Sequence, residues 1–351
     1  MADGSRTLLV MKDLLKLTRP LNLLIIAATM ALMRYGVIGG HLERGLRQLV
    51  DQVGDVQRAD LILPAHFGPQ MPLPLFIALV LSTVLIAAGG NVINDYFDTR
   101  IDRINKPDAV IVGRTVKRRV AMTAHGVLSG VGMLLGAFVA WRTGLWKWAA
   151  IPAFAIGALW VYSTTFKRRL IVGNGLVAIL TGLVPLTVGL YELPLLQRAM
   201  DPTWVVELPN HDRYEMQPFH IELWYWILGF AVFAFLSTLV RELQKDMADV
   251  KGDEADGCRT LPIVWGMKWA RTLVLVHIGI IIALLLFLRS QLLRDPLSYW
   301  YIGIAIIGPL LLSAGFTYQA HHRQEFVRAG NIMKVAMITA IGYALLIRYI
   351  P

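Results

Sequence analysis

The sequence predicts an all-α polytopic membrane protein, because of its hydropathy, its low charge content and the length of its apolar segments. Hydrophobic residues make up 56% of the 351 residues, the mean hydropathy is +0.56, and charged residues account for only 17%. Soluble domains carry a larger charged fraction. Apolar runs of about 20 residues recur along the chain, which is the length that an α-helix needs to cross a bilayer.

The apolar segments predict nine transmembrane helices, packed as a bundle around a central cavity. They cover 17–39, 73–101, 119–141, 146–164, 171–192, 221–245, 267–289, 298–319 and 330–350. Two polar insertions, at 40–72 and 193–220, interrupt the series; both contain Pro, Asp and Glu, and neither is expected to cross the membrane. We therefore treat 1–351 as one transmembrane domain with two insertions.

The distribution of basic residues predicts the orientation of the bundle. With the N-terminus in the cytoplasm, most of the 34 Lys and Arg residues fall on cytoplasmic helix ends and loops. These are Arg6, Lys12, Lys16, Arg19, Arg100, Arg103, Lys106, Arg114, Lys117, Arg118, Arg119, Lys167, Arg168, Arg169, Arg241, Lys245, Lys251, Arg259, Lys268, Arg271, Arg323, Arg328 and Lys334. This bias is typical of cytoplasmic loops, so both insertions and the C-terminus are expected outside and the plasma membrane is the expected location.

Composition and motifs also exclude several classes of function. The net charge of +10 is attributed to the loop bias and to anionic lipid, because no soluble basic domain is present to bind nucleic acid. The single cysteine, Cys258, excludes an intramolecular disulfide and a multi-cysteine metal site. The N-terminus lacks the layout of a cleaved signal peptide, and no P-loop or dinucleotide fingerprint occurs. Gly132 and Gly136 are expected to serve close helix packing.

The stretch NVINDYFDTRIDRIN at 91–105 places carboxylates at the end of an apolar run, where charge is costly. Taken as helix, Asn91, Asp95, Asp98 and Asp102 fall within an arc of about 60° and extend over about 16 Å. The pattern predicts one polar stripe that runs to the cytoplasmic end of the second span.

A second stripe has the same spacing. It comprises Glu242, Asp246, Asp249 and Asp253 and lies 151 residues after the first, member for member, again at the predicted cytoplasmic end of a span. Such an internal repeat predicts two halves that place their acidic ends face to face. Each stripe alone is equally well explained as a solvated helix end with local Asp–Arg pairs, but two matching stripes favour a shared site.

Facing carboxylates repel one another unless cations neutralise them. Hard oxygen ligands without His or Cys select Mg²⁺, which keeps several waters and shares phosphate oxygens with few protein carboxylates. The sequence therefore predicts a Mg²⁺-bridged diphosphate site at the membrane boundary, with Asp95, Asp98, Asp102, Asp246, Asp249 and Asp253 as the metal ligands. The substrate is expected to have an anionic head and a lipid tail.

Basic and polar residues near other helix ends are candidates for substrate contacts. In YSTTFKRRLIVGN, Lys167 follows Tyr162 by about one and a half helical turns and is the preferred phosphate ligand, whereas Arg168 is as readily explained as a membrane anchor. TRPLN at 18–22 places Arg19 and Asn22 one turn apart. The predicted substrate-binding set is Asn22, Arg19, Asn91, Asn94, Arg114, Glu242, Lys245, Arg168 and Asn174.

These motifs resemble the UbiA-type intramembrane prenyltransferases. The family motif N-D-x-x-D-x-x-x-D is matched by Asn94, Asp95, Asp98 and Asp102, and the second acidic motif by Asp246, Asp249 and Asp253. A Tyr-to-Lys motif follows the fourth span, so the resemblance covers nearly the whole chain. Within the family, the two acidic stretches look most like the geranylgeranylglyceryl phosphate geranylgeranyltransferases of ether-lipid synthesis.

Two departures from the family pattern bear on the site. Many relatives read close to R-P-I-P-S-G after the first motif, whereas here 109–113 reads AVIVG, so one phosphate contact is lost unless Arg114 replaces it. The spacing from Tyr162 to Lys167 is also one residue longer than in many relatives, which makes Ser163 an alternative to Tyr162.

The resemblance implies Mg²⁺-dependent transfer of a prenyl group from an allylic prenyl diphosphate to a lipophilic acceptor. The catalytic residues would be the six aspartates with Lys167 and Tyr162. Aromatic candidates for the lining of the reactive centre are Tyr96, Phe97, Tyr162, Phe166 and Tyr191, of which Tyr162 is preferred. The tail is expected to lie in a groove that opens sideways to lipid.

Three alternatives remain open at this point. One is an aromatic prenyltransferase of quinone, haem or chlorophyll synthesis, which differs only in its acceptor. Another is a transporter or lipid carrier, although stripes at one membrane face rather than at the midplane favour an enzyme. The third is a structural membrane protein with solvated acidic helix ends.

Overall fold

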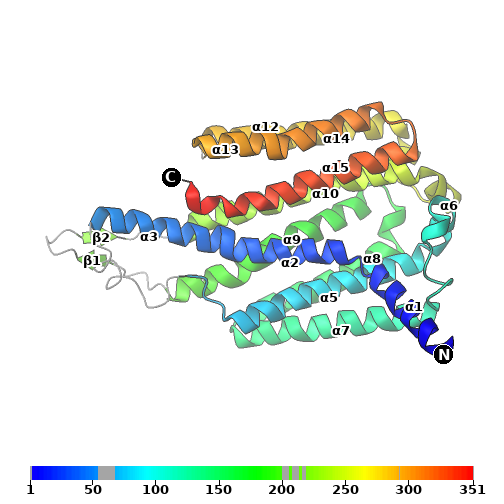
Figure 1. Ribbon diagram of the computed structural model, residues 1–351, viewed down its shortest axis with the longest axis horizontal. Coiled ribbons are helices and arrows are strands. Elements are labelled where there is room, and N and C mark those ends of the chain that lie inside the picture. Colours follow the sequence, from blue (N-terminus) through cyan, green and yellow to red (C-terminus); the bar gives the residue numbers. More distant parts are fainter. Residues whose placement is uncertain are drawn as a thin grey trace.

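The computed structural model describes residues 2–53, 68–199, 205–207, 213–215, 219–291 and 293–350. Within these ranges the long helices run roughly along one direction, and the molecule is elongated along it (Figure 1). The apolar core occupies the centre of the bundle, while large side chains such as Leu134, Phe287 and Ile304 are exposed on outward faces. That outer apolar surface is what a bilayer covers.

The N-terminal half is a series of helices connected by short segments. They are α1 (Ala2–Leu17), α2 (Pro20–Ala31), the π-helix η1 (Leu32–Ile38), α3 (Gly39–Val53), α5 (Leu73–Phe97), α6 (Thr99–Asn105), η2 (Pro107–Ala109), α7 (Arg118–Arg142), η3 (Trp146–Ala149), α8 (Ala150–Thr164) and η4 (Phe166–Arg168).

The C-terminal half is also mostly helical and contains one short pair of strands. Its elements are α9 (Val172–Ala199), β1 (Val205–Glu207), β2 (Arg213–Glu215), α10 (Phe219–Ala255), α11 (Leu261–Val264), α12 (Gly266–Gln291), α13 (Pro296–Trp300), η5 (Tyr301–Ile307), α14 (Gly308–Gln319), α15 (Arg323–Gly342), η6 (Tyr343–Leu345) and η7 (Ile347–Tyr349).

Among the described residues, seven helical stretches are long and apolar enough to cross a membrane. They begin at Pro20, Leu73, Arg118, Val172, Ile221, Gly266 and Pro296. The expectation of an integral membrane bundle is thereby confirmed. The two other expected spans, 146–164 and 330–350, coincide in part with α8, which has 15 residues, and with α15, which carries several charges. A total of nine spans, and the repeat of two halves, stay predictions.

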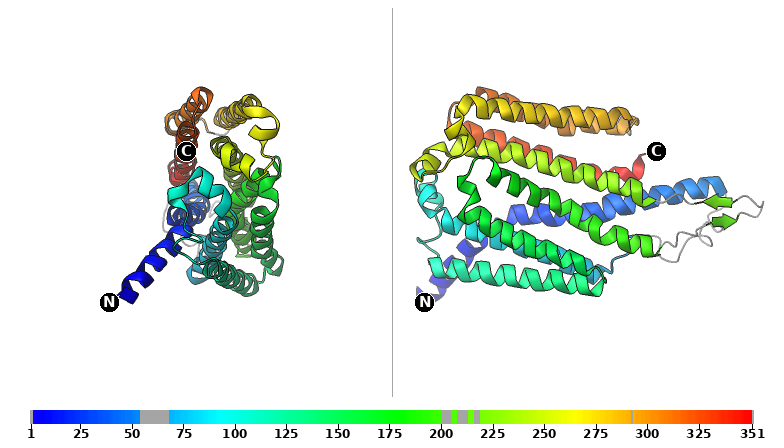
Figure 2. Two further views of the ribbon diagram at one scale, coloured as in Figure 1. Left: turned by 90° about the vertical axis from the view of Figure 1, so that its right-hand side faces the viewer. Right: turned by 180° about the vertical axis from the view of Figure 1, so that it is seen from behind.

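The two ends of the bundle differ in the segments that they hold. The N-terminus, α1 and α6 lie at one end, and α3, β1, β2 and the C-terminus lie at the other (Figures 1 and 2). Segments expected on the cytoplasmic side are thus separated along the long axis from the two insertions, as an alternating series of spans requires.

The insertions contain regular structure that the sequence analysis did not predict. The first span continues through η1 into α3, so the helix extends beyond residue 39 to Val53, and α9 continues past residue 192 with Pro194 inside it. β1 and β2 pair antiparallel, with Val205 opposite Glu215. The all-α expectation is confirmed for the bundle, and this short ribbon lies within the polar insertion at 193–220.

The acidic end of α5 also departs from expectation, because the first stripe does not lie on one helix. α5 ends at Phe97, Asp98 lies in a turn, and α6 starts at Thr99 and turns away from the α5 axis (Figure 1). The backbone bonds Asp98 N–H to Asn94 O and Asp102 N–H to Asp98 O remain. The bend therefore changes the direction of the stripe without unpairing the backbone.

A buried ion pair fixes the start of α5 to α9. Arg34 of η1 and Glu192 of α9 lie 3.0 Å apart and are almost fully buried. The Glu192 carboxylate also accepts the backbone N–H groups of Gln70 and Met71, while Arg34 donates to the Met71 carbonyl oxygen. Because an unpaired charge in this environment costs several kcal/mol, these contacts hold the segment before α5 against the bundle.

α5 and α7 approach closely where α7 carries glycine. A Cβ atom at Gly132 would lie 2.7 Å from Ile86 Cγ1 and 3.0 Å from the Ser82 carbonyl oxygen, and one at Gly136 would lie 2.8 Å from Ser82 Oγ. Ser82 Oγ donates to the Gly132 carbonyl oxygen across the same contact. The packing role expected for the two glycines is confirmed.

This contact predicts that Gly132→Ala lowers stability. The added methyl group displaces Ile86 or the α5 backbone, and overpacking of this kind costs about 1–3 kcal/mol. Gly130→Ala is the matched control, since a Cβ there meets nothing within 4 Å. We expect a lower midpoint of thermal unfolding in detergent for Gly132→Ala alone; equal midpoints for the two variants would contradict the close approach.

Candidate functional site

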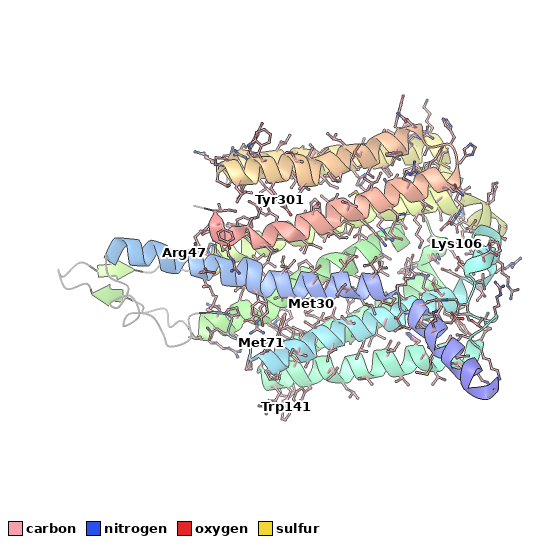
Figure 3. All side chains as sticks on the ribbon, viewed as in Figure 1. Met30, Arg47, Met71, Lys106, Trp141 and Tyr301 are labelled. Carbon is pink, nitrogen blue, oxygen red and sulfur yellow. The ribbon has the colours of Figure 1, made fainter. Side chains whose placement is uncertain are left out.

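Two adjoining cavities open between the helices near the α6 end of the bundle. The larger has a volume of about 330 Å³ and the smaller about 30 Å³, and Arg19, Asn94 and Lys245 line both. The smaller cavity is lined by Arg19, Asn94, Asp98, Ile101, Asp102, Lys106, Lys167, Lys245, Asp246, Asp249 and Asp253. Lys106 marks this end of the molecule in Figure 3, at the opposite end from Arg47.

The larger cavity is mainly apolar, and its polar lining residues Arg19, Asn94 and Lys245 are shared with the smaller one. Its polar lining comprises Arg19, Asn22, Ser82, Thr83, Asn91, Asn94, Tyr162, Thr181, Thr187, Tyr191, Thr238, Arg241, Glu242, Lys245 and Lys334. The remaining lining side chains are mostly Ile, Leu, Val and Ala from several helices. A long apolar tail with an anionic head matches this division.

The first acidic set faces basic side chains from elsewhere in the chain. Asp95 pairs with Arg19 at 2.6 Å, so the segment before α2 is tied to α5. Asp98 is buried, accepts the amide of Asn94 at 2.7 Å and pairs with Lys167. Burial and the neighbouring Asp98 charge raise the pKa of Asp102. A cation placed between these carboxylates would relieve both effects.

The second acidic set lies on α10 and opens into the same small cavity. Asp246 accepts the Asn174 amide at 2.7 Å. Asp249 faces Arg323 at 3.4 Å and Lys106 at 3.8 Å. Five aspartates from two distant segments therefore share one cavity wall with four basic side chains.

Asn105 connects α6 directly to α10. Its amide donates to the Asp249 carbonyl oxygen at 3.0 Å, and its Oδ1 accepts the backbone N–H of Gly252 at 3.0 Å. A Cβ atom at Gly252 would lie 2.4 Å from Asn105 Nδ2, so a side chain there would displace the Asn105 amide from this contact. Neither residue was predicted from the sequence, although the position of Asn105 one turn beyond Asp102 is a signal.

Lys167 is the basic residue most closely joined to the acidic set. It lies in η4, pairs with Asp98 and lines the smaller cavity. Burial lowers its pKa, but the Asp98 charge, the hydrogen bond to Asp98 and the nearby Tyr162 together raise it more, so the net shift is upward and the side chain stays cationic at neutral pH. A fixed ammonium group beside the carboxylates provides a phosphate ligand.

Tyr162 lies where the sequence analysis expected a functional side chain. It is buried in α8 and lines the larger cavity, as does Tyr191. Ser163, the alternative to Tyr162, donates to the Leu159 carbonyl oxygen within its own helix. The other aromatic candidates line neither cavity: Tyr96 and Phe97 contact each other, and Phe166 lies beside Arg169.

Some of the predicted substrate-binding residues line a cavity, and others lie outside both cavities. Asn91 lines the larger cavity and donates to the Thr18 carbonyl oxygen at 2.9 Å, and Glu242 lines it while pairing with Arg241. Arg114 is exposed on a turn and lines neither cavity. Arg168 pairs with Asp256 at 3.0 Å and also lines neither.

The lining residues that the predicted site left out include three charged side chains, Lys106, Arg241 and Lys334, and the hydroxyl group of Thr238. Lys334 was assigned to a cytoplasmic helix end, and this is wrong, because α15 starts at Arg323 and places Lys334 inside the helix. Its position within the apolar half of α15, after Ile332 and Met333, is the signal that could have identified it.

Comparisons with known proteins bear on the identity of this fold and site. Residues 63–338 match the model of the UbiA prenyltransferase family. The chain is 31% identical over 262 residues to a digeranylgeranylglyceryl phosphate synthase of Methanosphaera stadtmanae, covering 73% of this chain and 82% of the relative.

Solved structures of the same family share the fold. An apo UbiA homologue from Aeropyrum pernix K1 has a TM-score of 0.60 at 13% identity, covering 93% of this chain and 99% of that one. A UbiA homologue from Archaeoglobus fulgidus bound to GPP and Mg²⁺ has a TM-score of 0.54 at 14% identity, covering 95% and 99%. The chain belongs to the UbiA prenyltransferase family and is an integral membrane prenyltransferase.

Proposed function

We propose that this enzyme transfers a geranylgeranyl group from geranylgeranyl diphosphate to geranylgeranylglyceryl phosphate, a step of ether-lipid synthesis, with Mg²⁺ as cofactor. The observation that carries the proposal is the junction of the two cavities, where an acidic pocket adjoins a larger, mainly apolar one. The relative that shares 31% identity is named for the synthesis of digeranylgeranylglyceryl phosphate, which supports this acceptor.

The acidic pocket fits Mg²⁺ held together with a diphosphate. In the described part of the chain, no three His, Cys, Asp or Glu side chains converge tightly enough to hold an ion by themselves. Mg²⁺ is usually held by one or two carboxylates and by substrate phosphate oxygens, so Asp98, Asp102, Asp246, Asp249 and Asp253 would share it with the donor. Asn94 Oδ1, buried without a hydrogen-bond partner, adds an oxygen at the same place.

Bound Mg²⁺ would neutralise charge on the diphosphate as it leaves. Around it, Lys167 and Lys245 line the same pocket and would present positive charge to the phosphate oxygens. The allylic carbon–oxygen bond breaks with its electron pair going to the departing diphosphate, the carbon forms a bond to the acceptor hydroxyl oxygen, and the hydroxyl proton passes to the released diphosphate. Tyr162 lies in the adjoining cavity, where its ring can face the electron-poor carbon.

The same helices supply a dry site for this chemistry. Ile25, Ile26, Met337 and Ile338 line the larger cavity, and Ile338 is 47% exposed on the outer face of α15. This supports the groove that opens sideways to lipid, since a geranylgeranyl tail partitions into the bilayer.

We further propose that the N-terminus and the acidic pocket face the cytoplasm of the plasma membrane. The bias of Lys and Arg toward this end of the bundle supports the orientation. A tag on the N-terminus should react with a membrane-impermeant label only after the cells are permeabilised, and labelling of intact cells would contradict the orientation.

The acceptor is tested by incubating the purified enzyme with labelled geranylgeranyl diphosphate and Mg²⁺. We expect labelled product with geranylgeranylglyceryl phosphate and none with hydroxybenzoate-type acceptors. Asp246→Ala, which removes a lining carboxylate, should abolish transfer while the protein still purifies as a folded species. Product on aromatic acceptors only would overturn the ether-lipid proposal in favour of a quinone-type pathway.

Lys167 and its neighbour Arg168 form a matched pair for testing the acidic pocket. Lys167→Gln removes a charge from the pocket and should lower kcat/KM by about 10²–10³-fold, the loss typical of one transition-state donor. Arg168→Gln removes a surface charge paired with Asp256 and should change kcat/KM by no more than about threefold. Equal losses in steady-state kinetics would argue against the special role of Lys167.

A further inference from the structure

The larger cavity carries more positive than negative charge. Arg19, Arg241, Lys245 and Lys334 line it, against one carboxylate, Glu242. Arg19 is committed to Asp95, and Arg241 and Lys245 share Glu242 at 2.8 and 3.8 Å. Arg241, Lys245 and Lys334 are thus balanced by one carboxylate, Glu242, in a mainly apolar cavity, where an unpaired charge costs several kcal/mol.

Of the four basic side chains that line the larger cavity, Lys334 differs in having no ion pair with a carboxylate among the described residues. Its ammonium group donates to the neutral Asn22 Oδ1 at 3.2 Å. It lies inside α15, between the buried Met333 and the lining residue Met337, rather than at a helix end in water. A lysine in such a position usually has an anionic partner; among the described residues the carboxylate that acts on it is Glu242, which already pairs with Arg241 and Lys245.

An unpaired hydroxyl lies in the same cavity. Thr238 is 3% exposed, and its Oγ1 has no hydrogen-bond partner. It precedes Arg241 by three positions on α10, so the two side chains lie one above the other on a helix face. A buried hydroxyl left unsatisfied costs about 1–3 kcal/mol, and a ligand oxygen would remove this penalty.

These groups are separate from the acidic pocket. Asn22, Thr238, Arg241 and Lys334 line only the larger cavity, whereas the aspartates line only the smaller one. The two cavities meet at Arg19, Asn94 and Lys245. A donor diphosphate in the acidic pocket therefore leaves room for a second anionic head beside it.

We propose that Lys334 and Arg241, assisted by Asn22 and Thr238, bind the phosphate monoester of the acceptor. This inference rests on the proposed function, in which the acceptor is a glyceryl phosphate lipid. A phosphate monoester carries about two negative charges and three acceptor oxygens near neutral pH, which matches two cations, one hydroxyl and one amide. Phosphate bound here holds the acceptor hydroxyl near the junction of the cavities, next to the donor carbon.

The test separates the Michaelis constants of the two substrates. Lys334→Gln and Arg241→Gln should each raise KM for geranylgeranylglyceryl phosphate about 10–100-fold, the loss typical of a hydrogen bond to a charged group. KM for geranylgeranyl diphosphate should stay within about threefold. Lys334→Arg keeps the charge and should restore much of the acceptor affinity. Arg328→Gln is the control, since Arg328 is exposed on the same helix and lines neither cavity.

Two further arms identify the phosphate group as the ligand. Wild-type enzyme should use geranylgeranylglycerol, which lacks the phosphate, far less well than the phosphorylated acceptor, and Lys334→Gln should reduce this preference. Inorganic phosphate should compete with the acceptor in the wild type and compete more weakly in Lys334→Gln.

The outcomes separate this inference from the proposed function. If the wild type uses the phosphorylated acceptor but neither variant changes its KM, the binding site is wrong and the function stands. If the variants raise KM for the donor diphosphate instead, the cations serve the donor and the inference is overturned. If the wild type transfers nothing to phosphorylated acceptors, both fail together.

Discussion

The structure depends on the approach of the α6 end of α5 to the acidic end of α10. Five aspartates converge on one small cavity, and their mutual repulsion is offset by Lys106, Lys167, Lys245 and Arg19. The hydrogen bonds of the Asn105 amide to α10 hold the two segments at this distance, and a side chain at residue 252 would displace that amide. The repulsion among these carboxylates makes the site unfavourable by itself. A ligand that brings a metal cation and phosphate oxygens would relieve it.

The opposite end of the bundle has a different kind of constraint. There Arg34 and Glu192 neutralise each other in the interior, and the Glu192 carboxylate also accepts two backbone N–H groups. This paired buried charge fixes the packing of η1, α5 and α9. Lys334 differs from Arg34 because it lines a cavity and donates only to the neutral Asn22 amide oxygen.

Much of this arrangement could be predicted from the sequence. Apolar length predicts the helices, and the matching periods of the two acidic stretches predict a shared site. The bend at Asp98 could not be predicted, because the spacing of the carboxylates is the same on a straight helix. Strands of three residues, as in β1 and β2, are too short to show the alternation of apolar and polar residues that predicts a strand. The Asn105–Gly252 contact could not be predicted because it joins residues distant in sequence. Lys334 was assigned to a helix end because the predicted span starts at 330, whereas α15 starts at Arg323.

The central claim is that both acidic segments bind one metal–diphosphate group. A double-mutant cycle with Asp98→Asn and Asp249→Asn tests it most directly, with Mg²⁺-dependent binding of a non-reactive geranylgeranyl diphosphate analogue measured by calorimetry. The account predicts that each change weakens binding strongly and that the double variant loses less than the sum, with a coupling of about 0.5–3 kcal/mol. Fully additive losses, or Mg²⁺-dependent binding unchanged by either substitution, would contradict a shared site.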